Sequence, residues 1–201
     1  MNAEKVHLRS ITAADTAKVV TWRNKDFVRR NFIYQKLFTE EGHMAWLREQ
    51  VEPGHVAQFI ICVETDGGAE NTGAQMKTAE SSQAAVREIG SVYLRDIDRE
   101  KKNAEYGVFI GEEDTLGRGY GSQAAKLMLA YGFETLHLEK IFLRVLEDNV
   151  GARKSYEKAG FQMMENRRET VSLEQGKRDV IFMEAERSAW ESAKRSGMEK
   201  I

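Results

Sequence analysis

A glycine-rich loop between a strand pattern and a helix pattern constrains this chain more than any other feature. The strand-like run Y-G-V-F-I at 106–110 is followed by L-G-R-G-Y-G-S, which leads into a long apolar helix pattern. The N-terminus of a helix carries unpaired backbone N–H groups and a partial positive charge, which together attract phosphate. Glycines in the loop would let the backbone approach an anion without a Cβ in the way. The segment from Val108 to Ser122 is therefore predicted to hold a phosphate group.

Two common phosphate-binding motifs do not fit this loop. A dinucleotide-binding G-x-G-x-x-G would need a glycine where Ser122 stands, within an early β-α-β unit that the sequence lacks. A P-loop would need Gly-Lys followed by Ser or Thr, which is also absent. A purely structural role stays open from the loop alone, because helix starts and tight turns also recruit glycine.

Hydrophobic periodicity predicts a single α/β domain in a chain of 201 residues. Strands are predicted at 6–11, 57–64, 88–94, 103–110, 140–146, 161–173 and 178–184, and helices from 12, from 39, at 119–136 and at 150–159. The first helix is expected to begin with a capping box between Thr12 and Asp15 and to bury Ala17 and Val20. The domain is predicted at 1–186, with a mobile surface loop at 66–87 and a helical tail at 187–201.

Charge and composition argue against several other classes of function. Thirty Lys and Arg nearly balance 32 Asp and Glu, so no overall field would draw the chain to nucleic acid or a membrane. The longest apolar runs fall short of the roughly 18 residues of a membrane span, and the polar start M-N-A-E-K favours a cytoplasmic protein. Cys62 is the only cysteine, and the four histidines lack the spacing of a metal site, so no metal is expected.

A second motif lies one strand pattern further along the chain. The run I-F-L-R-V-L-E is followed by D-N-V-G-A-R-K-S-Y-E-K-A-G-F. Together with the glycine loop, this segment resembles the GNAT superfamily of N-acetyltransferases, where an R/Q-x-x-G-x-G/A loop precedes an N-x-x-A-x-x-x-Y-x-x-x-G-F segment. The second pattern is matched at Asn149, Ala152, Tyr156, Gly160 and Phe161. The resemblance implies a single-domain α/β (α+β) fold in the order β-α-α-β-β-β-α-β-α-β-β, with helices flanking a mixed, mostly antiparallel sheet of about six or seven strands.

The resemblance also implies acetyl-CoA as co-substrate and assigns roles to both motifs. The cofactor-binding residues that it implies are Val108, Phe109, Ile110, Leu116, Gly117, Arg118, Gly119, Tyr120, Gly121, Ser122 and Asn149. Tyr156 would protonate the leaving thiolate. Glu105 would be the base for the amine, unless it is an ordinary carboxylate at the start of a strand. Leu116 departs from the family pattern, which usually has Gln or Arg there, while Arg118 stands two residues later.

The acceptor amine is less well defined by the sequence. W-R-N at 22–24 and T-x-E-x-H-x-x-W at 39–46 resemble acetyltransferases of nucleotide-linked aminosugars and of ribosomal-protein N-termini, whereas A-A-K-L-x-L-x-Y-G-F at 124–133 is similar to polyamine acetyltransferases. The candidate substrate-binding residues are Arg29, Arg30, Tyr34 and His43. Cations in this region favour a small nucleotide-linked aminosugar over a polyamine, although a solvated run of charges is an equal alternative. A catalytically silent CoA-binding module also stays open, as does a homodimer formed through the helix around Trp190.

Overall fold

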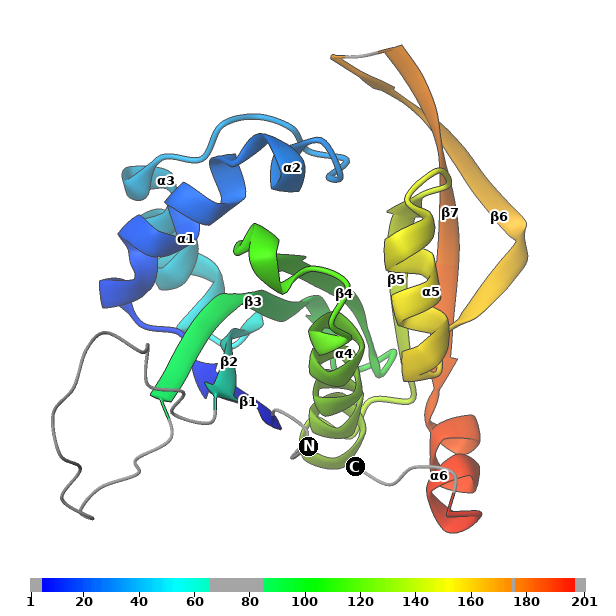
Figure 1. Cartoon of the computed structure of the whole chain (residues 1–201). Coiled ribbons are helices and arrows are strands. Elements are labelled where there is room, and N and C mark those ends of the chain that lie inside the picture. Colours follow the sequence, from blue (N-terminus) through cyan, green and yellow to red (C-terminus); the bar gives the residue numbers. More distant parts are fainter. Residues whose placement is uncertain (1–4, 66–84, 175, 198–201) are drawn as a thin grey trace, which may run out of the picture.

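Seven strands form one mixed sheet in the described part of the chain, as the sequence predicts (Figure 1). The computed structural model describes residues 5–65, 85–174 and 176–197. The strands are β1 (Lys5–Ser10), β2 (Ala57–Thr65), β3 (Ala85–Asp98), β4 (Asn103–Ile110), β5 (Lys140–Leu146), β6 (Gln162–Leu173) and β7 (Gly176–Glu186), ordered β1-β2-β3-β4-β5-β7-β6. The α-helices are α1 (Thr16–Asn24), α2 (Asp26–Arg29), α3 (Glu40–Trp46), α4 (Tyr120–Ala130), α5 (Val150–Ala159) and α6 (Arg187–Arg195). The 3₁₀ turns η1 (Ala13–Asp15) and η3 (Glu113–Thr115) and the π-helical segments η2 (Leu47–Val51) and η4 (Tyr131–Thr135) complete the order.

The two faces of the sheet are covered by different helices. Along β2, Ile61 and Val63 join the core that includes Met128 of α4. Their neighbours Ile60 and Cys62 join a second core on the opposite face, built around α1. Because both faces of β2 are buried, its sequence is a continuous apolar run and lacks the alternation of a half-exposed strand.

The parallel pair formed by β4 and β5 separates after three residues. Residues 103–105 of β4 pair with 140–142 of β5, and no further pairing between these strands occurs in the described residues. β4 nevertheless stays paired with β3 as far as Ile110, and β5 stays paired with β7 as far as Leu146. The sheet therefore opens into two halves at this point, one on each side of the gap in Figure 1.

The first helix buries a different side from the one predicted. Val19 and Trp22 are buried, whereas Ala17 is exposed and Val20 is half-buried. The prediction was wrong because Ala17 and Val20 lie on a different side of α1 from Val19 and Trp22. The side that packs on Ile60, Cys62 and Phe109 is the one with the larger apolar side chains.

The third strand is longer than predicted at both ends. β3 begins at Ala85 and therefore includes the end of the predicted loop, and it continues to Asp98, beyond the predicted end at 94. The remainder of the predicted loop, 66–84, lies outside the described residues. At the other end of the chain, α6 follows β7 directly, and its Trp190 packs on Phe133 of the same chain with ring centroids 5.5 Å apart.

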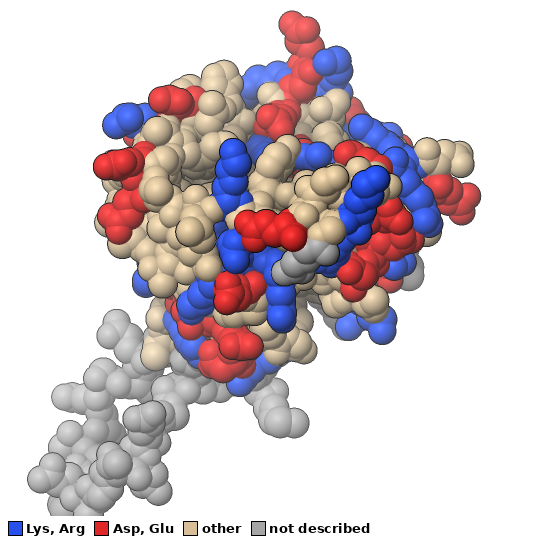
Figure 2. Space-filling view, turned by 90° about the horizontal axis from the view of Figure 1, so that it is seen from above, with Lys and Arg blue, Asp and Glu red and all other residues tan. Residues whose placement is uncertain are grey.

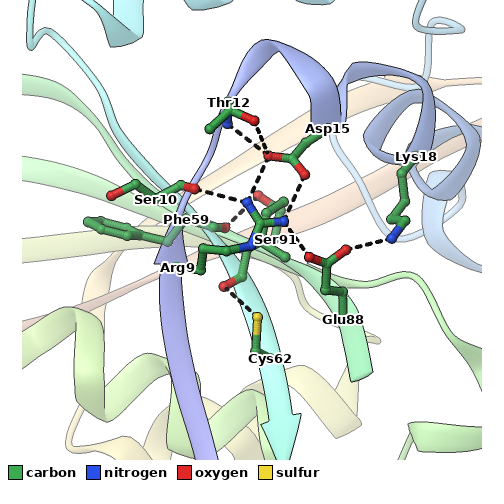
Figure 3. A network of polar contacts seen from close by, with 10 residues as sticks. Arg9, Ser10, Thr12, Asp15, Lys18, Phe59, Cys62, Glu88 and Ser91 are labelled. Carbon is green, nitrogen blue, oxygen red and sulfur yellow. Dashed lines mark hydrogen bonds and ion pairs between the residues drawn. The ribbon is translucent and has the colours of Figure 1, made fainter. Parts of the chain in front are cut away.

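An ion-pair network fastens the start of α1 to the sheet (Figure 3). Arg9 of β1 donates to both carboxylate oxygens of Asp15, at 2.7 and 3.0 Å, and also to Glu88 of β3. Glu88 in turn accepts from Lys18 of α1. Asp15 closes the predicted capping box with Thr12, whose amide donates to it at 2.8 Å. Arg9 holds the pKa of the Asp15 carboxyl at about 2, below its ordinary value.

Asp15→Asn is expected to lower the free energy of unfolding by about 2 kcal/mol at pH 7, because it removes this stabilised carboxylate. The folded-state pKa lies below the unfolded one, so the stabilisation is complete above about pH 4 and is lost as the pH falls toward 2. Urea unfolding at pH 7 and pH 3 should therefore show a smaller difference between wild type and variant at pH 3. Glu49→Gln, at an exposed position, is the control. An equal difference at the two pH values would contradict this account.

Candidate active site

A cavity of about 590 Å³ occupies the opening between β4 and β5. Its walls come from β4, the loop before α4, the start of α4, the end of β5 and one side of α5. The two sequence motifs therefore meet at one cavity, although a helix and a strand separate them along the chain. The predicted cofactor residues that line it are Val108, Phe109, Ile110, Leu116, Gly117, Gly119, Tyr120, Gly121, Ser122 and Asn149. Arg118 is exposed and does not line it.

Two backbone amides of β4 point toward the opening. The amide of Gly111, just after β4, donates to the carbonyl of Ile89 at 2.7 Å, so Gly111 faces β3 in the antiparallel ladder. Amide direction alternates along a strand, so the amides of Val108 and Ile110 face away from β3, on the side where β5 has separated. Such N–H groups can serve as donors to a bound ligand or to a developing oxyanion.

The loop before α4 is turned by two glycines in the left-handed region. Gly117 has φ +76° and Gly119 has φ +85°, and Gly119 is the N-cap of α4. A Cβ at either position would meet no atom within 4 Å, so these glycines serve the turn of the chain and not close packing. Because the N-cap has no side chain, no side-chain hydrogen bond caps α4. The positive end of the α4 dipole therefore lies at the cavity, where it would attract an anion.

Other residues of the loop hold α4 against α5. Ser122 is buried, and its Oγ lies 3.0 Å from both the carbonyl oxygen and the hydroxyl of Ser155 on α5. Gly121 allows this close approach, since a Cβ there would lie 3.2 Å from the Ser155 hydroxyl. Tyr120 is 4% exposed and belongs to the core beneath α4. These residues thus set the shape of the cavity wall that they line.

Asn149 and Tyr156 approach the cavity from α5. Asn149 is the N-cap of α5, and its Oδ1 accepts from the amide of Ala152 at 3.2 Å, which leaves Nδ2 as its donor group. Tyr156 packs edge-on against Tyr106 and Phe161, with ring centroids 5.9 and 6.0 Å away. Burial raises the pKa of the Tyr156 phenol above its ordinary value. Its hydroxyl is therefore protonated at neutral pH, the state that a proton donor requires.

Glu105 lies at the last paired position of β4, where the two strands part. Its Oε1 accepts from Arg95 Nη2 of β3 at 2.8 Å and from Arg144 Nε of β5 at 3.1 Å. The ring of Tyr34 lies close to both arginines, with its centroid 5.8 and 6.0 Å from their guanidinium carbons. Three strands and one loop thus contribute to a single cluster, in which Glu105 is the shared anion.

A second cavity, of about 370 Å³, adjoins the first. Five residues line both cavities, namely Phe32, Tyr34, Tyr93, Arg95 and Phe109. The second cavity is otherwise lined by Val19, Arg23, Leu37, Phe38, Thr39, Gly42, His43, Trp46 and Gln58. Two of the predicted substrate-binding residues therefore line it. Tyr34 is 59% exposed at the junction of the cavities, whereas His43 is 3% exposed.

The other two predicted substrate-binding residues, Arg29 and Arg30, do not line either cavity. Arg29 forms an ion pair with Glu174, between β6 and β7, at 3.2 Å. Arg30 is exposed, and its backbone carbonyl accepts from Arg178 of β7. In this structure these two residues therefore connect the α2 region to the β6–β7 hairpin.

Arg23, Tyr93, Arg95 and Arg144 are among the residues that line the cavities without having been predicted as site residues. A charge in the middle of a strand pattern was the available signal for Arg144, which interrupts I-F-L-R-V-L-E. Arg95 lies just beyond the strand predicted at 88–94, and Arg23 was noted only as part of W-R-N. The side of the sheet to which each residue points depends on strand register, which the sequence pattern does not give.

The outer surface shows a different distribution of charge from the cavities. In the face seen from above, Lys and Arg side chains are interspersed with Asp and Glu, without a large area of one sign (Figure 2). Three arginines and Glu105 line the part of the cavities between the α1–α3 region and the strands. A molecule bound in the cavities would therefore contact these charged side chains.

Comparison with known protein families identifies the family in which the two motifs and this cavity occur. A family model described as an acetyltransferase (GNAT) domain matches residues 5–162, which include both motifs and every strand from β1 to β5. The chain belongs to the GNAT acetyltransferase family. The resemblance predicted from the two motifs is thereby confirmed, and acetyl-CoA as co-substrate fits the family and the cavity.

Several relatives are similar to this GNAT chain over different lengths. An uncharacterised protein of Methanocaldococcus jannaschii is 25% identical over 82% of this chain, and spermidine N(1)-acetyltransferase of Escherichia coli is 38% identical over 37% of it. These matches cover only 30% and 39% of the two relatives' own lengths. The crystal structure of spermidine N-acetyltransferase from Vibrio cholerae has the same fold, with a TM-score of 0.74 and 20% identity over 92% of this chain and 97% of that one. None of the helices in the described residues is long and apolar enough to cross a membrane.

Gly107→Ala is expected to lower the free energy of unfolding by about 1 to 3 kcal/mol, because a new Cβ would overpack the junction of the cavities. That Cβ would stand 2.3 Å from Cζ of Tyr93, the cross-strand partner of Gly107. Urea unfolding measures the loss. The double variant Gly107→Ala/Tyr93→Leu should recover part of it, since the smaller side chain vacates the space. A Gly107→Ala protein as stable as the wild type would contradict the close approach.

Proposed function

We propose that this protein transfers an acetyl group from acetyl-CoA to a primary amine of a small molecule that carries negative charge. The observation that carries the proposal is the cavity between β4 and β5. It brings together the outward amides of Val108 and Ile110, the uncapped start of α4 and the hydroxyl-bearing Tyr156. An acyl-CoA needs donors along its pantetheine arm, an anion site for its pyrophosphate and an acid for its departing thiolate.

The chemistry requires one bond to form and one to break. The neutral amine attacks the thioester carbon, and amides such as those of Val108 and Ile110 stabilise the oxyanion that develops. Collapse of this intermediate breaks the C–S bond, and Tyr156 donates a proton to the thiolate. The amine nitrogen loses a proton to a base or to water, which leaves an amide product and free CoA. Asn149 would hold the pantetheine arm through its Nδ2.

The contacts of Glu105 favour a positioning role over the base role predicted from the sequence. Its carboxylate is 12% exposed and already accepts hydrogen bonds from Arg95 and Arg144. A base must take up a proton, which would break these two ion pairs inside a cavity. We therefore infer that Glu105 orients the two arginines and that water carries the proton of the amine.

The charge of the cavities supports an anionic acceptor. Among the described residues that line the cavities, the cations Arg23, Arg95, Arg144, Lys154 and Lys158 outnumber the single carboxylate, Glu105. Arg95 and Arg144 also pair with Asp96 and Glu169, at 3.6 and 3.9 Å, but these carboxylates line neither cavity. A nucleotide-linked aminosugar, the class favoured by the sequence, meets this requirement. The support now comes from these three arginines, because Arg29 and Arg30 lie outside the cavities.

Polyamine acetylation is the second candidate function. It is favoured by the similarity to proteins named spermidine acetyltransferase. Carboxylates that could bind a polycation are nearby, because Glu40 and Glu41 begin α3, but both are exposed and do not line either cavity. The interior of the site therefore favours the anionic amine.

Release of free thiol from acetyl-CoA tests the proposal across a UDP-linked aminosugar, spermidine, amino acids and peptide N-termini. An anionic amine is expected to react faster than spermidine. With the best acceptor, Tyr156→Phe should lower kcat by roughly 10² to 10⁴ without changing the Kd of CoA, because only the proton donor is lost.

Thermal unfolding of the Tyr156→Phe protein provides the control for folding, since the phenyl ring keeps the contacts with Tyr106 and Phe161. Full activity in this variant would remove the proposed acid role. Binding of CoA without thiol release for any acceptor would instead indicate a catalytically silent module.

Glu105→Gln separates the two roles considered for this residue. If Glu105 positions Arg95 and Arg144, the variant should have a higher KM for an anionic acceptor, and its activity relative to wild type should stay constant from pH 7 to 9. If Glu105 is the base, the relative activity should rise with pH, because amines with pKa values of about 8 to 10 deprotonate in solution. Steady-state kinetics over this pH range distinguish the outcomes.

A further inference from the structure

Two buried polar atoms in the wall of the second cavity have no hydrogen-bond partner among the described residues. They are Nη1 of Arg23 and Nε2 of His43. Arg23 is 2% exposed and His43 is 3% exposed, so water does not readily replace the missing partners. Buried polar atoms in folded proteins are nearly all paired, because an unpaired one has lost its hydration without compensation. Two such atoms on one cavity indicate that a ligand supplies the partner.

Arg23 is fixed in place on its other sides. Its Nη2 donates to the carbonyl of Tyr34 at 2.7 Å. Its guanidinium carbon lies 3.4 Å from the ring centroid of Phe32 and 4.8 Å from that of Phe38. Burial lowers its pKa to about 10, so the group is still charged at neutral pH. The result is a rigid cation whose Nη1 amino group has no acceptor among the described residues.

His43 is oriented in a similar way. Its Nδ1 lies 3.0 Å from the hydroxyl of Thr16 on α1, which leaves Nε2 as the ring nitrogen without a partner. Burial lowers the pKa of the imidazole, which is therefore neutral at neutral pH. The single hydrogen of the Thr16 hydroxyl points to Sδ of Met44 at 3.3 Å in this structure, and a thioether sulfur is a weak acceptor. Rotation of that hydroxyl toward Nδ1 would place the imidazole hydrogen on Nε2, which would then donate to a bound anion.

The remaining wall of this cavity is mainly aromatic. The aromatic side chains are Phe32, Tyr34, Phe38, Trp46, Tyr93 and Phe109. Among the described residues that line it there is no Asp or Glu, whereas Arg23 and Arg95 are both cations. Such a cavity suits a flat or apolar molecule that ends in an anionic group, and it disfavours a polycation.

We propose that this cavity anchors the acceptor amine through a carboxylate at its far end, which accepts hydrogen bonds from Arg23 Nη1 and His43 Nε2. The proposal rests on the proposed function, because the amine end would then lie at the junction with the first cavity, beside Tyr34 and Tyr93. A carboxylate supplies the single charge that matches one unpaired guanidinium. The diphosphate of a nucleotide-linked aminosugar carries more charge than this one guanidinium balances, so in such an acceptor it would lie outside the second cavity, beside the other cations that line the first.

A matched pair of ligands tests the anchor. 4-(Aminomethyl)benzoate has a primary amine, an aromatic body and a distal carboxylate, and 4-(aminomethyl)benzamide differs only at the distal group. In calorimetry on the CoA-saturated protein, the benzoate is expected to bind at least about tenfold more tightly, the factor expected for one hydrogen bond to a charged group. Arg23→Gln should abolish this preference and leave the Kd of CoA unchanged. Arg48→Gln, which removes an exposed cation outside both cavities, should keep the preference.

Each outcome bears on the anchor independently of catalysis, because calorimetry measures binding without turnover. Selective binding that depends on Arg23, without thiol release, supports the anchor and contradicts the proposed function. Equal binding of the two ligands by the wild type overturns the anchor, even if acetyl transfer occurs. An equal loss of affinity for both ligands in Arg23→Gln also overturns it. Arg23 would then act only by holding the backbone at Tyr34 in place. If Arg23→Gln does not fold, the proposal is tested by the two ligands on the wild type and by Arg23→Lys. The lysine variant keeps the positive charge and should therefore retain part of the preference for the benzoate.

Discussion

The separation of β4 from β5 is the constraint on which the rest of this structure depends. Two parallel strands that remained paired would use their amides on each other and would leave no space between them. Here the pairing stops after 105, while each strand stays bonded to its outer neighbour. The gap is thus held open by two intact half-sheets. It leaves the amides of Val108 and Ile110 facing the gap, where they can donate to a ligand. α4 and α5 lie on either side of this gap, so the proposed catalytic chemistry depends on the interrupted pairing of the two strands.

The same opening decides how the two substrates would meet. The residues at the junction of the cavities come from β3, β4 and the connection after α2, so the acceptor cavity is continuous with the slot between the strands. Glu105 stands at the point of separation and ties Arg95 to Arg144 across it. Removing that anion would leave two guanidinium groups beside each other in a partly buried site. Glu105 therefore stabilises the two arginines on which the proposed preference for an anionic acceptor depends.

The sequence was sufficient for the elements and for the local motifs, and insufficient for contacts between strands. The glycine loop and the Asn149–Phe161 segment each consist of one turn and one helix. Their geometry depends on residues close in the sequence, which makes it predictable. Arg95 and Arg144 meet at Glu105 only because three strands take a particular register, which no short pattern encodes. Arg29 lies near the site in the chain, but α2 directs it to the β6–β7 hairpin. Arg23 was missed because contacts with the sheet fix the buried side of α1, and a charged side chain carries no apolar signal of burial.

Amide hydrogen exchange followed by NMR, with and without CoA, tests the role of the opening most directly. The amides of Val108 and Ile110 should exchange at least about tenfold more slowly when CoA is bound, because the ligand becomes their hydrogen-bond partner. The amides of Gly107 and Phe109 face β3 and should change much less. Unchanged exchange at Val108 and Ile110 in the CoA complex would contradict the account.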